Sequence, residues 1–321
     1  MARTNGNTTE VLQNYLDPKV LARIHRLDVR TRLVVEGFLA GMHRSPYQGL
    51  SVEFRQHREY APGDDTRHID WKVYSRTDRY YIKQYEEETN LRCTFLVDVS
   101  ESMKYAGRGG WKEGLSKYHY AACLASSMAM LLLRQQDAAA LTTFDEDIVA
   151  SVPPSANPNA IKTIVHTLDA ASRRLVAKTG LENVCSRAAE QLSRRGMVCL
   201  ISDLLSDDDE GLIRGLSRLA HRGHDVIVLH VLDEEELTFP FDGNVRFIGL
   251  EAAGELIAQP RALRDGYLES LQRFLTFLKR RCTANRIDYV TFSTADHLGG
   301  ALAYFLSRRE EFGRKGANKR R

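Results

Sequence analysis

Two aspartates and two serines are the residues of this chain whose types and spacing could do chemistry. Asp98, Ser100 and Ser102 form a D-x-S-x-S pattern, and Asp203 stands much later, after Ile201-Ser202. Because alternate residues leaving an extended strand project to the same side, one carboxylate and two hydroxyls can converge on a point. Oxygen ligands of this kind suit Mg²⁺ or Mn²⁺. The pattern indicates a divalent-metal site, with the alternative that Asp98 and Ser100 cap the following loop and helix.

Apolar runs that alternate with helical patterns must position these residues. The tight turn Asp145-Glu146-Asp147 predicts that the strand after it is antiparallel and lies at an edge. The remaining alternation predicts an α/β fold, a doubly wound, mostly parallel six-stranded sheet covered on both faces. Sites on such sheets form at the carboxyl ends of the strands, where the winding reverses. The expected strands are 91–98, 138–144, 148–152, 197–202, 225–231 and 288–293, and the expected helices are 111–135, 158–172, 181–194, 207–222, 261–285 and 297–308.

The edge arrangement resembles the metal-ion-dependent adhesion site of von Willebrand factor type A domains. In that family a D-x-S-x-S after the first strand joins a distant threonine and an aspartate after the fourth strand. Thr179, in Lys178-Thr179-Gly180-Leu181, matches the threonine. The resemblance implies a Rossmann-like fold and a single Mg²⁺ or Mn²⁺ that captures an acidic Asp or Glu side chain of a partner protein. The five ligands that it implies are Asp98, Ser100, Ser102, Thr179 and Asp203.

A second resemblance lies upstream of the expected sheet. Its residues are Glu53-Phe54-Arg55, residues 58–65 (REYAPGDD), residues 67–72 (RHIDWK) and Ser75-Arg76-Thr77. They resemble the signature of the bacterial domain of unknown function 58 family, which couples it to a type A-like domain. What this resemblance implies is an adaptor that works with MoxR-type AAA+ ATPases in protein assembly or remodelling. A zinc site at His57, His68 and Asp70 is disfavoured, because no cysteine and no second histidine at helical spacing lies nearby.

The pattern along the chain predicts four segments. Residues 1–16 are a frayed N-terminus, and 17–90 hold a helix (about 17–42) and a small β-rich unit with strands at 51–56 and 80–85. Residues 91–309 form the type A-like domain, and 310–321 form a basic tail. The net charge of +3 gives no indication of nucleic-acid binding.

The compartment and the class of function follow from what the sequence contains. Five cysteines without a C-x-x-C pair, three of them inside apolar runs, favour buried free thiols and a cytoplasmic protein. The sequence also shows no secretory signal and no apolar stretch long enough for a transmembrane segment. A phosphatase with Asp98 as nucleophile would need a second acid where Ser100 stands. Leu115 replaces the lysine of a P-loop after Gly109 and Gly114. We therefore expect a non-catalytic binding module, with a metal-dependent hydrolase and a scaffold with a degenerate metal site as the alternatives.

Overall fold

The structure is a computed structural model in which the main body of the chain is described. It describes residues 91–107, 115–173, 179–192, 195–206, 208–249 and 254–318, together with 27, 31–32, 34–35, 57–59, 74–76 and 79–83. The predicted frayed terminus 1–16, the strand 51–56 and most of the signature at 53–77 lie outside these residues, as do His68, Asp70 and the glycines 109, 110 and 114.

A six-stranded sheet forms the centre of the molecule. The strand order is β10-β7-β6-β3-β4-β5, and all neighbours are parallel except β4 and β5, which are antiparallel. The predicted α/β fold with one antiparallel edge strand is therefore confirmed. The strands are β3 (Arg92–Asp98), β4 (Ala138–Phe144), β5 (Ile148–Ser155), β6 (Met197–Ser202), β7 (Asp225–Leu232) and β10 (Asp288–Ser293).

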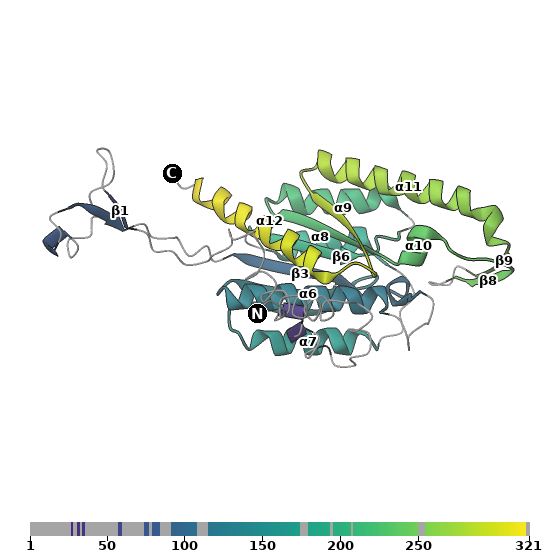
Figure 1. The fold of residues 1–321 in the computed structure, drawn as a ribbon, viewed down its shortest axis with the longest axis horizontal. Coiled ribbons are helices and arrows are strands. Elements are labelled where there is room, and N and C mark those ends of the chain that lie inside the picture. Colours follow the sequence, from purple (N-terminus) through teal and green to yellow (C-terminus); the bar gives the residue numbers. More distant parts are fainter. Residues whose placement is uncertain are drawn as a thin grey trace, which may run out of the picture.

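Helices cover both faces of this sheet. Figure 1 shows α6 and α7 on one side of the sheet and α8, α9 and α11 on the other. Helix α12 packs on the face of α6 through residues such as Phe305. The long helices are α6 (Lys117–Arg134), α7 (Ala160–Ala171), α8 (Leu181–Gln191), α9 (Asp209–His221), α11 (Pro260–Ala284) and α12 (Leu298–Asn318).

Two helix boundaries differ from the sequence-based expectation by more than three residues. The predicted helix 111–135 begins at Lys117, because the Ser116 hydroxyl caps it by accepting a hydrogen bond from the backbone N–H of His119 over 3.2 Å. The last helix continues past the predicted end at residue 308 to Asn318. Asp208 and Asp209, from the predicted acidic helix start, lie at the start of α9, and the Asp208 carboxylate accepts a hydrogen bond from the Gly211 N–H.

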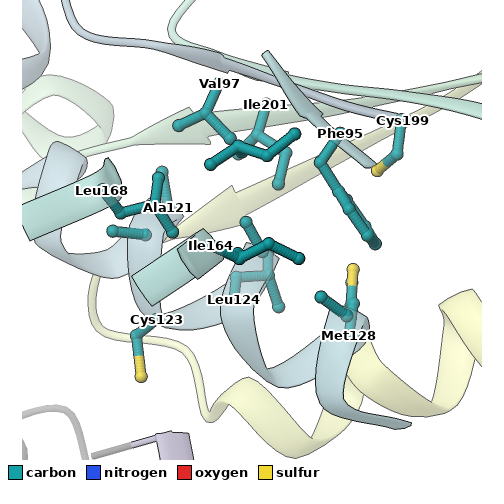
Figure 2. Close-up of a cluster of buried hydrophobic side chains, with 14 of the residues drawn as sticks. Phe95, Val97, Ala121, Cys123, Leu124, Met128, Ile164, Leu168, Cys199 and Ile201 are labelled. Atoms are coloured by element: carbon teal, nitrogen blue, oxygen red, sulfur yellow. The ribbon is translucent and has the colours of Figure 1, made fainter. Parts of the chain in front are cut away.

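The core between the sheet and α6 fixes the position of β3 and β6. Figure 2 shows the side chains of Phe95 and Val97 from β3 and of Ile201 from β6 facing those of Leu124 in α6 and Ile164 in α7. All five are buried, and burying such side chains stabilises a fold by about 1.5–3 kcal/mol each. The carboxyl ends of β3 and β6 are thereby held side by side.

Smaller elements complete the described part of the chain. The strands β1 (His57–Glu59) and β2 (Tyr81–Lys83) pair in an antiparallel sheet of their own; the second falls within the predicted strand 80–85, and the first follows the predicted strand 51–56. The short helices η2 (Ser102–Lys104) and α10 (Glu234–Thr238) and the antiparallel pair β8 (Val245–Ile248) and β9 (Glu255–Ala258) were not predicted. None of the helices in the described ranges combines the length and apolar character that a membrane crossing requires.

Candidate functional site

The predicted site lies where the winding of the sheet reverses. From β3 the chain proceeds outward to β4 and β5, whereas from β6 it proceeds the other way to β7 and β10. Val97 pairs with Ile201 in the parallel register of β3 and β6, so Asp98 and Ser202 end the two strands next to each other. This is the point at which open α/β sheets place their binding sites.

Asp98 is fully buried, and both of its carboxylate oxygens accept hydrogen bonds. The backbone N–H of Ser100 donates to Oδ1 over 2.9 Å, and the Ser202 hydroxyl donates to Oδ2 over 2.6 Å. Beside it, the hydroxyls of Ser100 and Ser102 are hydrogen-bonded to each other over 3.1 Å. The D-x-S-x-S residues therefore converge as the alternate spacing predicts.

Two carboxylates, those of Asp98 and Asp203, lie close together in the buried space at the ends of β3 and β6, and their negative charges disfavour each other. Burial, and then the nearby Asp203 carboxylate, raise the pKa of Asp98 from 3.8 to about 7, although the hydrogen bonds from Ser202 and Ser100 act to lower it. Like charges that share a buried space shift a pKa in this direction. A divalent cation at this point would favour the ionised carboxylate and so act against both effects.

Asp203 is fully buried as well and carries a positive partner. Its Oδ2 accepts a hydrogen bond from the Lys117 ammonium over 2.8 Å, and its Oδ1 accepts from the Leu205 N–H over 3.3 Å. The Lys117 Nζ also lies 2.7 Å from Oε1 of Glu236. Burial lowers the pKa of Lys117, but the Asp203 and Glu236 carboxylates together raise it above its ordinary value, so the side chain is an ammonium.

His230 holds the backbone of Asp203 in place from the neighbouring strand β7. Its Nε2 lies 2.8 Å from the Asp203 carbonyl oxygen, which can only accept, so Nε2 carries the proton. Burial lowers the pKa of His230 to about 4, and the neutral ring therefore accepts the Tyr289 hydroxyl at Nδ1 over 2.7 Å. The position of Asp203 is fixed by both its side chain and its main chain.

Thr179 lies at the same edge of the sheet, on the β4 side of β3. The Gly180 N–H donates to the Asp145 carbonyl over 2.9 Å, and Asp145 directly follows β4. A Cβ on Gly180 would come within 2.3 Å of the Glu146 carbonyl oxygen, so only glycine permits this approach. Thr179 itself is half-buried.

Helix α10 fastens the segment that follows the two serines. Oδ2 of Asp233 accepts from the Gly107 N–H over 3.2 Å, and Oε2 of Glu235 accepts from the Tyr105 hydroxyl over 3.0 Å. Glu236 contributes the bond to Lys117 described above. One acidic turn thus contacts three parts of the candidate site.

Comparison with known proteins places this chain in a family. The model of a family described as "Protein of unknown function DUF58" matches residues 56–273, which is more than half of the chain. The chain belongs to the DUF58 family. Uncharacterized proteins of Mycobacterium bovis and Mycobacterium tuberculosis are each 27% identical to it over 259 residues, which are 78% of this chain and 77% of theirs.

Solved structures give more distant likenesses to this DUF58 protein. The conserved hypothetical protein BatB from Bacteroides thetaiotaomicron is 15% identical, with a TM-score of 0.45, over 69% of this chain and 99% of that one. The SpRpn10 VWA domain is 12% identical, with a TM-score of 0.35, over 66% of this chain and 93% of that one.

The candidate donor set of the DUF58 protein consists of carboxylate and hydroxyl oxygens, which are ligand types that Mg²⁺ and Mn²⁺ accept. The structure brings Asp98, Ser100, Ser102 and Asp203 to one corner and places Thr179 at the same edge. Burial and the neighbouring Asp203 carboxylate raise the pKa of Asp98, so a cation beside it would stabilise its ionised form. Within the described residues, no group of three or more His, Cys, Asp or Glu side chains is placed to hold a metal ion, and the predicted set contains only two carboxylates.

Ser202, Lys117 and Glu236 are among the supporting residues of this site that sequence reasoning missed. Ser202 could have been found, because it ends a predicted strand beside Asp203. Lys117 and Glu236 carry no such signal, since their contact joins residues 119 positions apart in the chain.

Proposed function

We propose that this DUF58 protein is a non-catalytic protein-interaction module that binds an acidic partner through one divalent cation, Mg²⁺ or Mn²⁺. The single observation that carries the proposal is the buried pair of carboxylates, Asp98 and Asp203, beside the Ser100 and Ser102 hydroxyls. Two carboxylates balance a divalent charge, and neutral hydroxyls leave the ion able to attract a further oxygen ligand.

The residues that would hold the ion are Asp98, Ser100, Ser102, Thr179 and Asp203. When bound, the ion supplies an electrophilic centre that an Asp or Glu side chain of the partner completes. Ser100 and Ser102 are 0% and 3% exposed, so an incoming carboxylate reaches the ion only after a local rearrangement around the site.

The environment of Asp98 supports binding rather than catalysis. Ser100 occupies the position of the second acid that a phosphatase with Asp98 as nucleophile would use.

The partner and the compartment are proposed from the family resemblance and the cysteines. The family implies that the acidic partner belongs to a MoxR-type AAA+ ATPase system, in which this protein acts as an adaptor in assembly or remodelling. All five cysteines are free and buried, which suits the reducing cytoplasm.

Metal-dependent capture tests this function. The purified full chain is immobilised and exposed to an extract of its source organism with Mg²⁺ or with a chelator, and retained proteins are identified by mass spectrometry. We expect an AAA+ ATPase to be retained only with Mg²⁺, and to be lost with Ser100→Ala. The matched control is Ser270→Ala, an exposed serine on α11, which should retain it. Equal retention with the chelator, or with Ser100→Ala, contradicts the proposal.

A further inference from the structure

Lys117 occupies a position in which a positive charge destabilises the folded protein unless that charge is paired. It is the first residue of α6, where the positive end of the helix dipole disfavours an ammonium. Its side chain is 1% exposed, and burying a charge costs several kcal/mol unless the charge is paired. Two carboxylates surround it instead of water, that of Asp203 directly after β6 and that of Glu236 in α10.

The ammonium and the proposed metal ion require the same oxygen-bearing group. Lys117 Nζ is 2.8 Å from Oδ2 of Asp203, and the other oxygen, Oδ1, already accepts the Leu205 N–H. An ion that uses the Asp203 carboxylate must therefore share it with a fixed positive charge or displace that charge. Two cations that share one buried carboxylate repel each other strongly.

Glu236 gives the displaced ammonium a second partner. Its Oε1 is 2.7 Å from Lys117 Nζ, and its Oε2 accepts the Asp233 N–H over 2.7 Å in the capping box of α10. Glu236 is therefore held in place independently of Asp203. Lys117 can therefore lose its ion pair with Asp203 and keep the one with Glu236.

From this geometry we infer that Lys117 is an internal competitor of the metal ion for Asp203 and sets the metal affinity of the site. This inference rests on the proposed function, since it concerns the same cation. Without the ion, the Lys117 ammonium neutralises the Asp203 carboxylate and stabilises the structure around it. With the ion, Lys117 pairs with Glu236 alone. The site then holds a divalent ion more weakly than its five oxygen ligands would allow by themselves.

Mn²⁺ binding to variants of the full chain tests the competition. Isothermal titration calorimetry with the metal alone compares wild type, Lys117→Met and the double variant Lys117→Met/Glu236→Gln. The double variant removes one positive and one negative charge, so the local net charge equals that of wild type. We expect both variants to bind Mn²⁺ at least about tenfold more tightly than wild type, because Asp203 becomes free. Lys162→Met, at an exposed lysine on α7, is the matched control and should bind like wild type.

Each outcome decides a different point. If Lys117→Met alone is too unstable to purify, the double variant carries the test, because it leaves no unpaired Glu236 carboxylate. Wild-type affinity in the folded double variant overturns the role of Lys117 and leaves the proposed function intact. Absence of Mn²⁺ binding in wild type and all variants overturns the proposed function and the competition together. Tighter binding by both variants, with an unchanged control, supports the competition.

Discussion

Asp98→Asn should stabilise the metal-free protein at neutral and alkaline pH, although it removes a predicted metal ligand. The pKa of Asp98 is raised from 3.8 to about 7 by burial and by the Asp203 carboxylate. A carboxyl group that binds its proton more tightly in the folded state stabilises the fold below its unfolded pKa. That contribution is lost as the pH rises through about 7.

The size of the effect follows from the two pKa values. They differ by about three pH units, and each unit corresponds to about 1.4 kcal/mol, so the full loss is on the order of 4 kcal/mol. Between pH 5 and pH 7 the unfolded state is ionised while the folded state keeps the proton, which predicts a loss of about 2–3 kcal/mol. Asparagine is neutral throughout, and its amide can still accept from the Ser100 N–H and contact Ser202.

Urea unfolding in a chelator at several pH values between 5 and 8 measures this loss. We expect the free energy of unfolding of wild type to fall relative to Asp98→Asn as the pH rises. Asp265→Asn, an exposed aspartate on α11, serves as the control and should follow wild type. Mg²⁺ at pH 8 should restore stability to wild type and not to Asp98→Asn. Parallel pH curves for wild type and Asp98→Asn would refute the reasoning.

Three further perturbations test the elements that support the site. Gly180→Ala should lower the melting temperature and weaken Mn²⁺ binding measured by calorimetry, because its Cβ would meet the Glu146 carbonyl oxygen at 2.3 Å and displace Thr179. Phe95→Ala should cost about 3–5 kcal/mol in urea unfolding, because a fully buried ring that packs against Phe305 is lost. The five cysteines should react with a thiol reagent only after denaturation, because all are buried and none is in a disulfide.

Each of these three expectations has a result that would contradict it. A Gly180→Ala protein that melts and binds Mn²⁺ like wild type would show that the loop before α8 does not depend on that close approach. A loss of less than about 1 kcal/mol in Phe95→Ala would contradict the packing of β3 against α6 and α12. Rapid reaction of any thiol in the native protein would contradict its burial.

The sheet was predictable because its strands can be recognised from short local patterns in the sequence. The runs at 138–144, 197–202 and 288–293 match β4, β6 and β10 residue for residue. The first two are short runs bounded by polar or turn-forming residues. The antiparallel β5 was equally clear, because a three-residue turn between two runs permits only a hairpin. Local pattern and tertiary structure agree in this part of the chain.

Short elements and helix starts were harder to predict. The strands β8 and β9 have four residues each, and α10 has five, which is too few for a periodic pattern to stand out. The start of α6 depends on the Ser116 cap rather than on the apolar residues before it. The extension of α12 to Asn318 passes through a charged segment without an apolar stripe that would predict it.

The candidate site also contains residues that the sequence predicts and residues that it does not. The spacing of Asp98, Ser100 and Ser102 and the strand before Asp203 predict their convergence, since neighbouring parallel strands end at one edge. Lys117 could not be predicted, because its charge suggested an exposed side chain and only the packed structure shows the two carboxylates around it. Buried ion pairs between distant segments leave no periodic trace in a sequence.

The central claim is that five oxygen-bearing side chains bind one divalent cation. Calorimetric titration of Mn²⁺ into wild type and into Ser100→Ala/Ser102→Ala tests it most directly, since this variant removes two hydroxyls and no charge. We predict one site in wild type and a loss of affinity greater than about tenfold in the variant. Changing residues that only support metal ligands already costs at least about tenfold in metal affinity, so removing two ligands should cost more. Equal affinity in the two proteins, or no heat of binding in wild type, would contradict the account.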